Sequence, residues 1–518
     1  MNNIIKLSAL AILTFMVSCV DLDETPEGSL TPEGFFNTVD DVYPMIDGTY
    51  GLMASSSYYG AGLTVPLQLM SDMVDNGYEF SDYAEFSPFL VTSTNSYVND
   101  IWASSYQTIA TANTAIKGIG LLDDTNETDK NLAEAEAEAR FVRAFLYYHL
   151  VRLYENIPYI DNPDIEDPLS IKQSNKEEVY VKIIEDMTFA FNNLEMTSRE
   201  GVKSRPSKGT AASYLSSIYM TLENWEKSYE NAKWVIDNAS ELNYALQDDF
   251  QNIFRNSEQW SSTEDIFTID FTGNQTGQNP NPVTYENDNK VGPFNGVEGG
   301  VSPIRGWSML VPHINVYDNW DVRDYRLKVS LADSLILNDD TNIVRPYTDF
   351  EIARPHIAKF NRFPGEGRTT AGWRSDLDFV AFRYAEVLLI AAESANELGL
   401  TTESVGFVNQ IRKRARNAGT INFDGSGYGI YAASSFPEDV NSSIDTDNLR
   451  TTIIEERRVE LAFEFKRWYD IVRLDLGSQV FNSDGLEPQS NFNDFRYLLP
   501  IPQDEMNKNE NFVQNPGY

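Results

Sequence analysis

The chain has little of what a disulfide-stabilised or catalytic protein needs. It contains 1 cysteine and 3 histidines among 518 residues. A single cysteine excludes an intramolecular disulfide, so packing must stabilise the folded chain. The HExxH, GxSxG and CxxC motifs of metalloproteases, serine hydrolases and thiol redox proteins are absent from the sequence. We therefore predict a protein that is not an enzyme and that has no metal site and no cofactor.

Basic residues are also scarce. Lys and Arg number 40 against 78 Asp and Glu, which gives a formal net charge of −38 and a pI near 4.3. Such a field repels polyanions, so we predict no nucleic-acid partner. The acidity favours a neutral ligand over an acidic one, although a basic patch around Arg305, Arg354, Arg368 and Arg374 would favour the reverse.

Long apolar runs are lacking, because none approaches the roughly 20 residues that cross a bilayer. The run Leu7–Val17 follows a basic residue and ends in a small residue before Cys19. This pattern is typical of a lipoprotein signal. We predict that residues 1–18 are removed, that Cys19 carries fatty acyl chains such as palmitate, and that residues 19–30 form a flexible tether. The alternative is an ordinary secreted protein with an incidental cysteine.

Apolar residues recur at three- and four-residue spacing over most of the chain, which predicts a mostly α fold. Short turns between the helices indicate irregular tetratricopeptide-like helix pairs instead of a regular solenoid. We expect helices at residues 101–119, 131–154, 177–194, 207–222, 225–236, 379–398, 403–417 and 449–474, and a helix-like segment at 310–320.

Residues 241–375 differ in composition, with more Gly, Asn, Asp and Pro and a few short strand-like runs such as 265–271. We therefore divide one compact unit into a helical part (31–240), a loop-rich ligand-binding part (241–375) and a C-terminal helical part (376–518). Loops on a rigid scaffold are where binding groups usually lie.

Four segments, in this order, carry a family resemblance: Ala137–Tyr154, Phe382–Glu393, Glu455–Arg473, and Leu499–Pro502 with Gln514–Tyr518. Together, behind a lipoprotein signal, they resemble the RagB/SusD family of Bacteroidetes outer-membrane nutrient-binding lipoproteins. The resemblance implies a SusD-like fold, a lipid anchor in the outer membrane with exposure at the cell surface, a glycan ligand, and a SusC-like TonB-dependent transporter as partner.

The charged residues of the third segment fall at three- or four-residue spacing, as on one face of a helix. We predict that they form a structural ion-pair network between helices and that none is a catalytic acid. They are Arg457, Glu460, Glu464, Arg467, Asp470 and Arg473.

A sugar site needs flat aromatic rings for the apolar ring faces and polar side chains for the hydroxyl groups. Two regions supply both: one contains Tyr58, Tyr59, Asp72, Asp75, Tyr78 and Tyr83, and the other contains Arg305 and Trp307. The resemblance implies that loops at these two places flank a shallow glycan groove and that an aromatic residue near Trp307 stacks on the sugar. Trp307 is the first candidate, followed by Tyr78, Trp373 and Trp260. Five other tryptophans are expected in the core: Trp102, Trp225, Trp234, Trp320 and Trp468.

These patterns predict a cell-surface lipoprotein that captures an oligosaccharide or polysaccharide and delivers it to a SusC-like TonB-dependent transporter. A peptide or glycopeptide cargo is the first alternative. An exported hydrolase is the second, because some pair among 78 carboxylates will always have a suitable separation for glycoside hydrolysis.

Overall fold

The fold comes from a computed structural model. It describes residues 36–77, 82–122, 128–165, 167–254, 261–271, 310–336, 344–350, 352–360, 377–417, 419–421, 428–482, 485–486 and 488–518.

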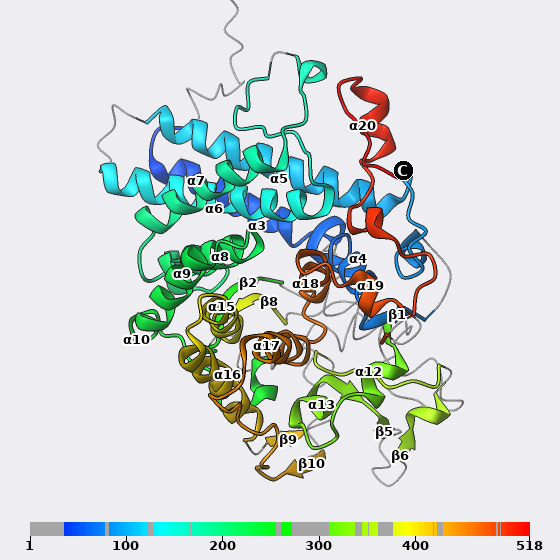
Figure 1. Cartoon of the computed structure of the whole chain (residues 1–518). Helices are drawn as coiled ribbons and strands as arrows, with labels where there is room; N and C mark the ends of the chain where they lie inside the picture. Colours follow the sequence, from blue (N-terminus) through cyan, green and yellow to red (C-terminus); the bar gives the residue numbers. More distant parts are fainter. Residues whose placement is uncertain are drawn as a thin grey trace, which may run out of the picture.

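Long helices dominate the N-terminal half, which confirms the mostly α prediction (Figure 1). The long helix α6 packs between α5 and α7, and α3 lies against α5. These helices form one layer, and α8 and α9 continue from it. Their bounds are α3 Val39–Met53, α4 Thr64–Leu69, α5 Ser96–Gly120, α6 Asp129–Tyr154, α7 Lys176–Asn193, α8 Lys208–Thr221, α9 Trp225–Asp237 and α10 Ala239–Leu242.

Side chains before these helices explain why they begin where they do. The Thr128 hydroxyl accepts a hydrogen bond from the Asn131 amide (3.2 Å), and Asn175 Oδ1 accepts one from the Glu178 amide (2.9 Å). Such caps satisfy amides that have no partner inside the helix. The starts predicted at 131, 177, 207 and 225 lie within two residues of the observed ones, whereas α5 begins five residues before the predicted 101, and α3 and α4 were not predicted.

The C-terminal half adds a second group of helices beside α8 and α9. Helix α15 packs against α9, α16 and α17. The bounds of these helices are α12 Ile314–Asp318, α13 Tyr325–Ser330, α15 Tyr384–Glu397, α16 Thr401–Ala415, α17 Thr446–Glu460, α18 Arg467–Arg473, α19 Gly477–Val480 and α20 Gln503–Lys508.

Three predicted helices are wrong in part. Residues 379–398 begin as strand β8 (Phe379–Arg383) before α15, and residues 310–320 divide into strand β3 (Leu310–Pro312) and α12. The helix expected at 449–474 is two helices, α17 and α18, separated by a non-helical stretch. Within that stretch Phe463 and Phe465 adopt the left-handed region with φ of 64° and 59°.

The described strands form two-stranded antiparallel pairs and no larger sheet. Strand β2 pairs with β8 beside α15, which joins a segment within the loop-rich part to the start of the C-terminal helical part. The remaining pairs are β1 with β3, β4 with β7, β5 with β6, and β9 with β10. The strand bounds not yet given are β1 Val74–Asn76, β2 Asp265–Ile269, β4 Leu331–Ala332, β5 Ser334–Ile336, β6 Val344–Pro346, β7 His356–Ile357, β9 Gly419–Ile421 and β10 Tyr428–Tyr431.

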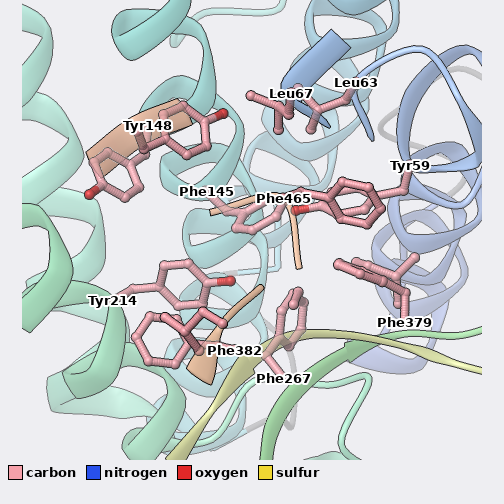
Figure 2. Packing of buried hydrophobic residues seen from close by; sticks show 14 of the residues in the cluster. Tyr59, Leu63, Leu67, Phe145, Tyr148, Tyr214, Phe267, Phe379, Phe382 and Phe465 are labelled. Atoms are coloured by element: carbon pink, nitrogen blue, oxygen red, sulfur yellow. The ribbon is translucent and has the colours of Figure 1, made fainter. Parts of the chain in front are cut away.

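Aromatic rings fill the junction between the two groups of helices (Figure 2). Phe145 of α6 lies 5.5 Å from the Tyr214 ring and 5.8 Å from the Phe267 ring, with edge-to-face geometry. Tyr214 in turn lies 4.9 Å from Phe382 of β8. Buried side chains from Phe36 to Phe512 belong to one cluster, so the described residues share one core.

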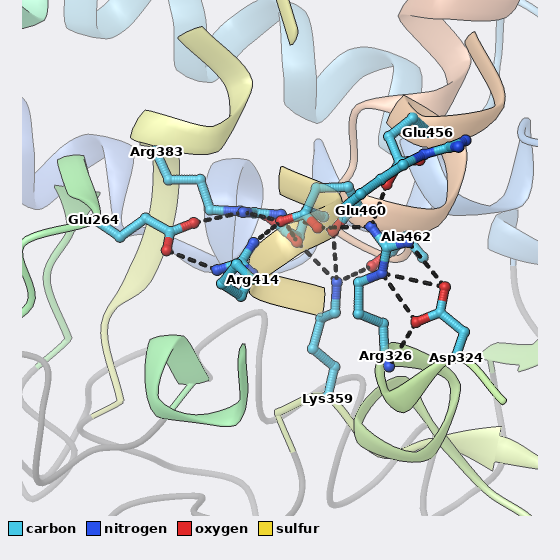
Figure 3. A network of polar contacts seen from close by, with 11 residues as sticks. Glu264, Asp324, Arg326, Lys359, Arg383, Arg414, Glu456, Glu460 and Ala462 are labelled. Carbon is cyan, nitrogen blue, oxygen red and sulfur yellow. Dashed lines mark hydrogen bonds and ion pairs between the residues drawn. The ribbon is translucent and has the colours of Figure 1, made fainter. Parts of the chain in front are cut away.

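A buried ionic network lies between α13, α16, α17 and β8 (Figure 3). The carboxylate of Glu460 accepts hydrogen bonds from Arg326 (2.9 Å), Arg383 (2.6 Å) and Arg414. Glu464 pairs with Lys359 (2.8 Å) and with Arg383 (2.7 Å). These contacts join different elements, so the predicted ion-pair network between elements is present. The charges therefore hold these elements together. The prediction that one continuous helix carries all of these charged residues is wrong.

Asp470 of α18 shows how the network responds to acid. Burial raises the pKa of Asp470, but Arg457 and Arg473 outweigh burial and hold the pKa at about 2, below its ordinary 3.8. A carboxyl group with a lowered folded-state pKa stabilises the fold above its unfolded-state pKa. We expect chemical denaturation to show stability falling from about pH 4 toward pH 2, with a smaller fall in Asp470→Asn. An equal fall in both proteins would contradict this assignment.

Among the described helices, none is long and apolar enough to cross a membrane.

Candidate ligand-binding site

Several predicted ligand-binding residues lie outside the described residues. The lipidation prediction at Cys19 also falls there, so it stays a prediction. The predicted ligand residues concerned are Tyr78, Arg305, Trp307, Trp373 and Trp260, together with Arg368 and Arg374 of the proposed basic patch.

Three predicted tyrosines lie in the core instead of facing a ligand. The solvent-exposed fractions of Tyr58, Tyr59 and Tyr83 are 1%, 5% and 0%. The Tyr59 ring lies 5.5 Å from Phe379, and its hydroxyl bonds His149 Nε2 at 3.2 Å (Figure 2). A ring packed on both faces has none free for a sugar, so we correct these three assignments to core packing.

Asp72 is likewise buried, and its carboxylate forms a bidentate pair with Arg467. Nε and Nη2 of Arg467 each lie 2.8 Å from a carboxylate oxygen of Asp72. Such a bidentate pair fixes the relative orientation of the two side chains as well as pairing their charges. The pair attaches the segment before β1 to α18, so Asp72 has a structural role here and not the predicted contact with a ligand.

The β1–β3 ladder pairs two short strands that adjoin the two predicted binding regions in the sequence. Val74, Asp75 and Asn76 pair with Pro312, Val311 and Leu310 in antiparallel register. Because the ladder ends at Asn76 and Leu310, the chain leaves β1 and enters β3 at the same end of the ladder. One predicted region continues directly from β1, and the other directly precedes β3.

Asp75 is the predicted ligand residue that remains partly open, with 28% of its side chain exposed. One carboxylate oxygen accepts a hydrogen bond from Ser87 (2.9 Å), and the other lies 3.2 Å from Arg354 Nη1. Arg354 keeps 24% exposure. The pair presents a carboxylate and a guanidinium beside the ladder, which are groups able to accept from and donate to hydroxyl groups.

His313 lies between the β1–β3 ladder and α12. No pattern in the sequence indicated a role for it. Its amide donates to the Met73 carbonyl (3.2 Å), and its Nδ1 accepts from the Asn315 amide (3.4 Å) at the start of α12. Burial lowers the pKa of His313, and the charge of Arg354 lowers it further. A neutral His313 therefore serves as a helix cap. Ser87 was also missed, because residues far apart in sequence meet only once the ladder forms.

A cavity beside Tyr59 is too small to hold a sugar. Its volume is 40 Å³, enough for a few waters. The Arg152 guanidinium lies between the rings of Tyr148 and Tyr469 at 3.6 and 3.5 Å in its wall. Among the described residues, no group of three or more His, Cys, Asp or Glu side chains is placed to hold a metal ion.

Comparisons with known proteins agree with this architecture. A family model described as the SusD family matches residues 263–518, and one described as starch-binding associating with outer membrane matches residues 31–220. SusD-like protein P2 of Formosa agariphila is 40% identical over 529 aligned positions, covering 99% of both chains.

Solved structures are similar at lower identity. A SusD homologue from Bacteroides thetaiotaomicron aligns over 94% of this chain and 98% of its own, with a TM-score of 0.77 and 20% identity. Surface glycan-binding protein A from the same organism, solved with laminarihexaose, aligns over 92% and 99% with a TM-score of 0.73 and 19% identity. These likenesses concern the fold. The fold, the two matching family models and the relative at 40% identity together show that the chain belongs to the SusD/RagB family.

Proposed function

We propose that this protein is a lipid-anchored glycan-binding protein of the outer-membrane surface. It captures an oligosaccharide or polysaccharide and delivers it to a SusC-like TonB-dependent transporter. It carries out no chemistry on the glycan. Cys19 is the anchor, and the family described as starch-binding associating with outer membrane supports this location.

The observation that carries the proposal is the register of the β1–β3 ladder. Its last pair, Asn76 with Leu310, supports a site where the segment after β1 faces the segment before β3. Tyr78 follows β1 by two residues and Trp307 precedes β3 by three. We place the groove at this end of the ladder, with Tyr78 and Trp307 as its proposed aromatic side chains and with Asp75 and Arg354 as its proposed polar partners.

The ligand class follows from the same groups. Aromatic rings pack against the apolar faces of sugars, and a paired carboxylate and guanidinium bond hydroxyl groups without leaving a net charge. With the net charge of −38, this favours a neutral glycan. Among structural neighbours, one is named a laminarin-binding SusD-like protein and another was solved with laminarihexaose, so laminarin is the first glycan to test.

Affinity electrophoresis of the purified chain tests the function. We expect laminarin or another neutral polysaccharide to retard migration, and we expect chromatography to recover the oligosaccharide at its original length. Retardation by acidic polysaccharides alone would contradict the preference for neutral glycans. Binding of a peptide library without any glycan would favour the peptide alternative, and shortened products would favour a hydrolase.

A further inference from the structure

A second, polar pocket lies away from the β1–β3 ladder. It has a volume of 190 Å³ and lies between the connection from α7 to α8, the end of α10 and the start of β2. Figure 1 shows α10 and β1 at opposite sides of the molecule. The pocket is therefore distinct from the proposed glycan groove.

Lys203 is a cation in this pocket for which the described part of the chain supplies no paired anion. Its side chain is partly buried, and its ammonium lies 4.7 Å from the centre of the Tyr244 ring. The described residues place no carboxylate within ion-pair distance of its Nζ and give its side chain no hydrogen bond. Burial lowers the pKa of Lys203, and Asp265 opposes that only in part. An ammonium partly removed from water without a counter-ion is unfavourable, so an anion entering the pocket would be stabilised.

The other cation of the pocket is already neutralised. The guanidinium of Arg205 lies 3.0 Å from Asp47 and over the ring of Tyr50. Lys203 is therefore the cation that a ligand would pair with. Among the lining residues that the structure describes, the one carboxylate is that of Glu241, which is exposed.

Neutral donors complete the lining. The side chains of Thr197 and Asn243 line the pocket and make no hydrogen bond with the described residues. A hydroxyl and an amide can each donate to an anionic oxygen. Ser207, which caps α8, also lines the pocket, so the positive end of the α8 dipole faces it.

We propose that this pocket binds an oxyanion, a sulfate or carboxylate group, with Lys203 as its counter-ion. The group is supplied either as a free ion or as a substituent of a sugar. The inference stands apart from the proposed glycan groove, since it uses none of the same residues.

Isothermal titration of the purified full chain in detergent tests the proposal, with sodium sulfate, sodium glucuronate and glucose at constant ionic strength. We expect sulfate, glucuronate or both to bind one to one, and glucose not to bind at this site. Binding of both assigns the site to the charged group, and binding of glucuronate alone assigns it to an acidic sugar. The absence of anion binding, or equal binding of glucose and glucuronate through Lys203, overturns the proposal.

Four variants separate charge from folding. Lys203→Met keeps the apolar stem over Tyr244 and should weaken anion binding by about tenfold or more, since it removes a charge-assisted contact. Lys203→Arg should retain binding, and Glu241→Gln should strengthen it by about two- to threefold by removing an exposed carboxylate. Lys208→Met, at the start of α8 but outside the pocket, is the matched control and should change nothing. Unchanged binding in Lys203→Met overturns the proposal.

Discussion

Replacing Glu460 with glutamine is expected to lower the free energy of unfolding by about 3–5 kcal/mol, because breaking a buried ion pair leaves an uncompensated charge. The Glu460 carboxylate is fully buried and bonds three guanidinium groups, those of Arg326, Arg383 and Arg414. Glutamine has a similar shape but no charge, and its NH₂ group would face a donor. Three cations would then remain in the core with too few acceptors.

Urea denaturation of Glu460→Gln and of the unchanged chain measures this loss. The control is Asp447→Asn on the same helix α17, where the carboxylate is 89% exposed and pairs with Arg450. A surface pair contributes about 0–1 kcal/mol, so this variant should unfold at nearly the same urea concentration as the unchanged chain. Equal small losses in both variants would show that the network does not stabilise the fold.

Replacing Cys19 with alanine is expected to move the protein from the membrane fraction into the soluble fraction. In our account acyl chains on Cys19 supply the attachment, and each buried methylene contributes about 0.8 kcal/mol to membrane binding. Without a thiol at position 19 no chain can be added. Sedimentation of membranes, followed by immunoblotting of pellet and supernatant, measures the shift.

The control is Met16→Leu, which keeps the thiol and exchanges one apolar residue of the signal for another. It should remain in the membrane pellet. If Cys19→Ala stays in the pellet, another part of the chain attaches the protein. If the unchanged chain is soluble, the cysteine is incidental and the secreted alternative holds.

Helix content was predictable because local sequence determines it. The periodic faces and caps of α6 and α7 depend on residues within a few positions of each other. The break between α17 and α18 was not predictable from local sequence, because the stretch between them contains neither Gly nor Pro. There Lys359 Nζ donates to the Ala462 carbonyl (2.7 Å), and Gln68 Nε2 donates to the Phe463 carbonyl (3.0 Å). Partners distant in sequence thus bond carbonyls that a continuous helix would use.

The candidate site was predictable only in part for the same reason. A loop rich in Tyr and Asp has the same composition whether its rings face solvent or the core. Asp72 is turned into the core by its pair with Arg467, and Tyr59 by its hydrogen bond with His149. Both partners come from other elements. Trp102, Trp320 and Trp468 are buried as expected, whereas Trp225 and Trp234 are only partly buried.

Titration of a bound glycan against the unchanged chain and Trp307→Ala tests whether the glycan groove lies at the β1–β3 ladder. We expect Trp307→Ala to weaken binding by about 30-fold or more, the loss expected when a stacking aromatic at the centre of a site is removed. Trp307→Tyr should keep most of the affinity, and thermal unfolding should be the same in all three proteins. Binding that survives Trp307→Ala unchanged would contradict a glycan groove at the β1–β3 ladder.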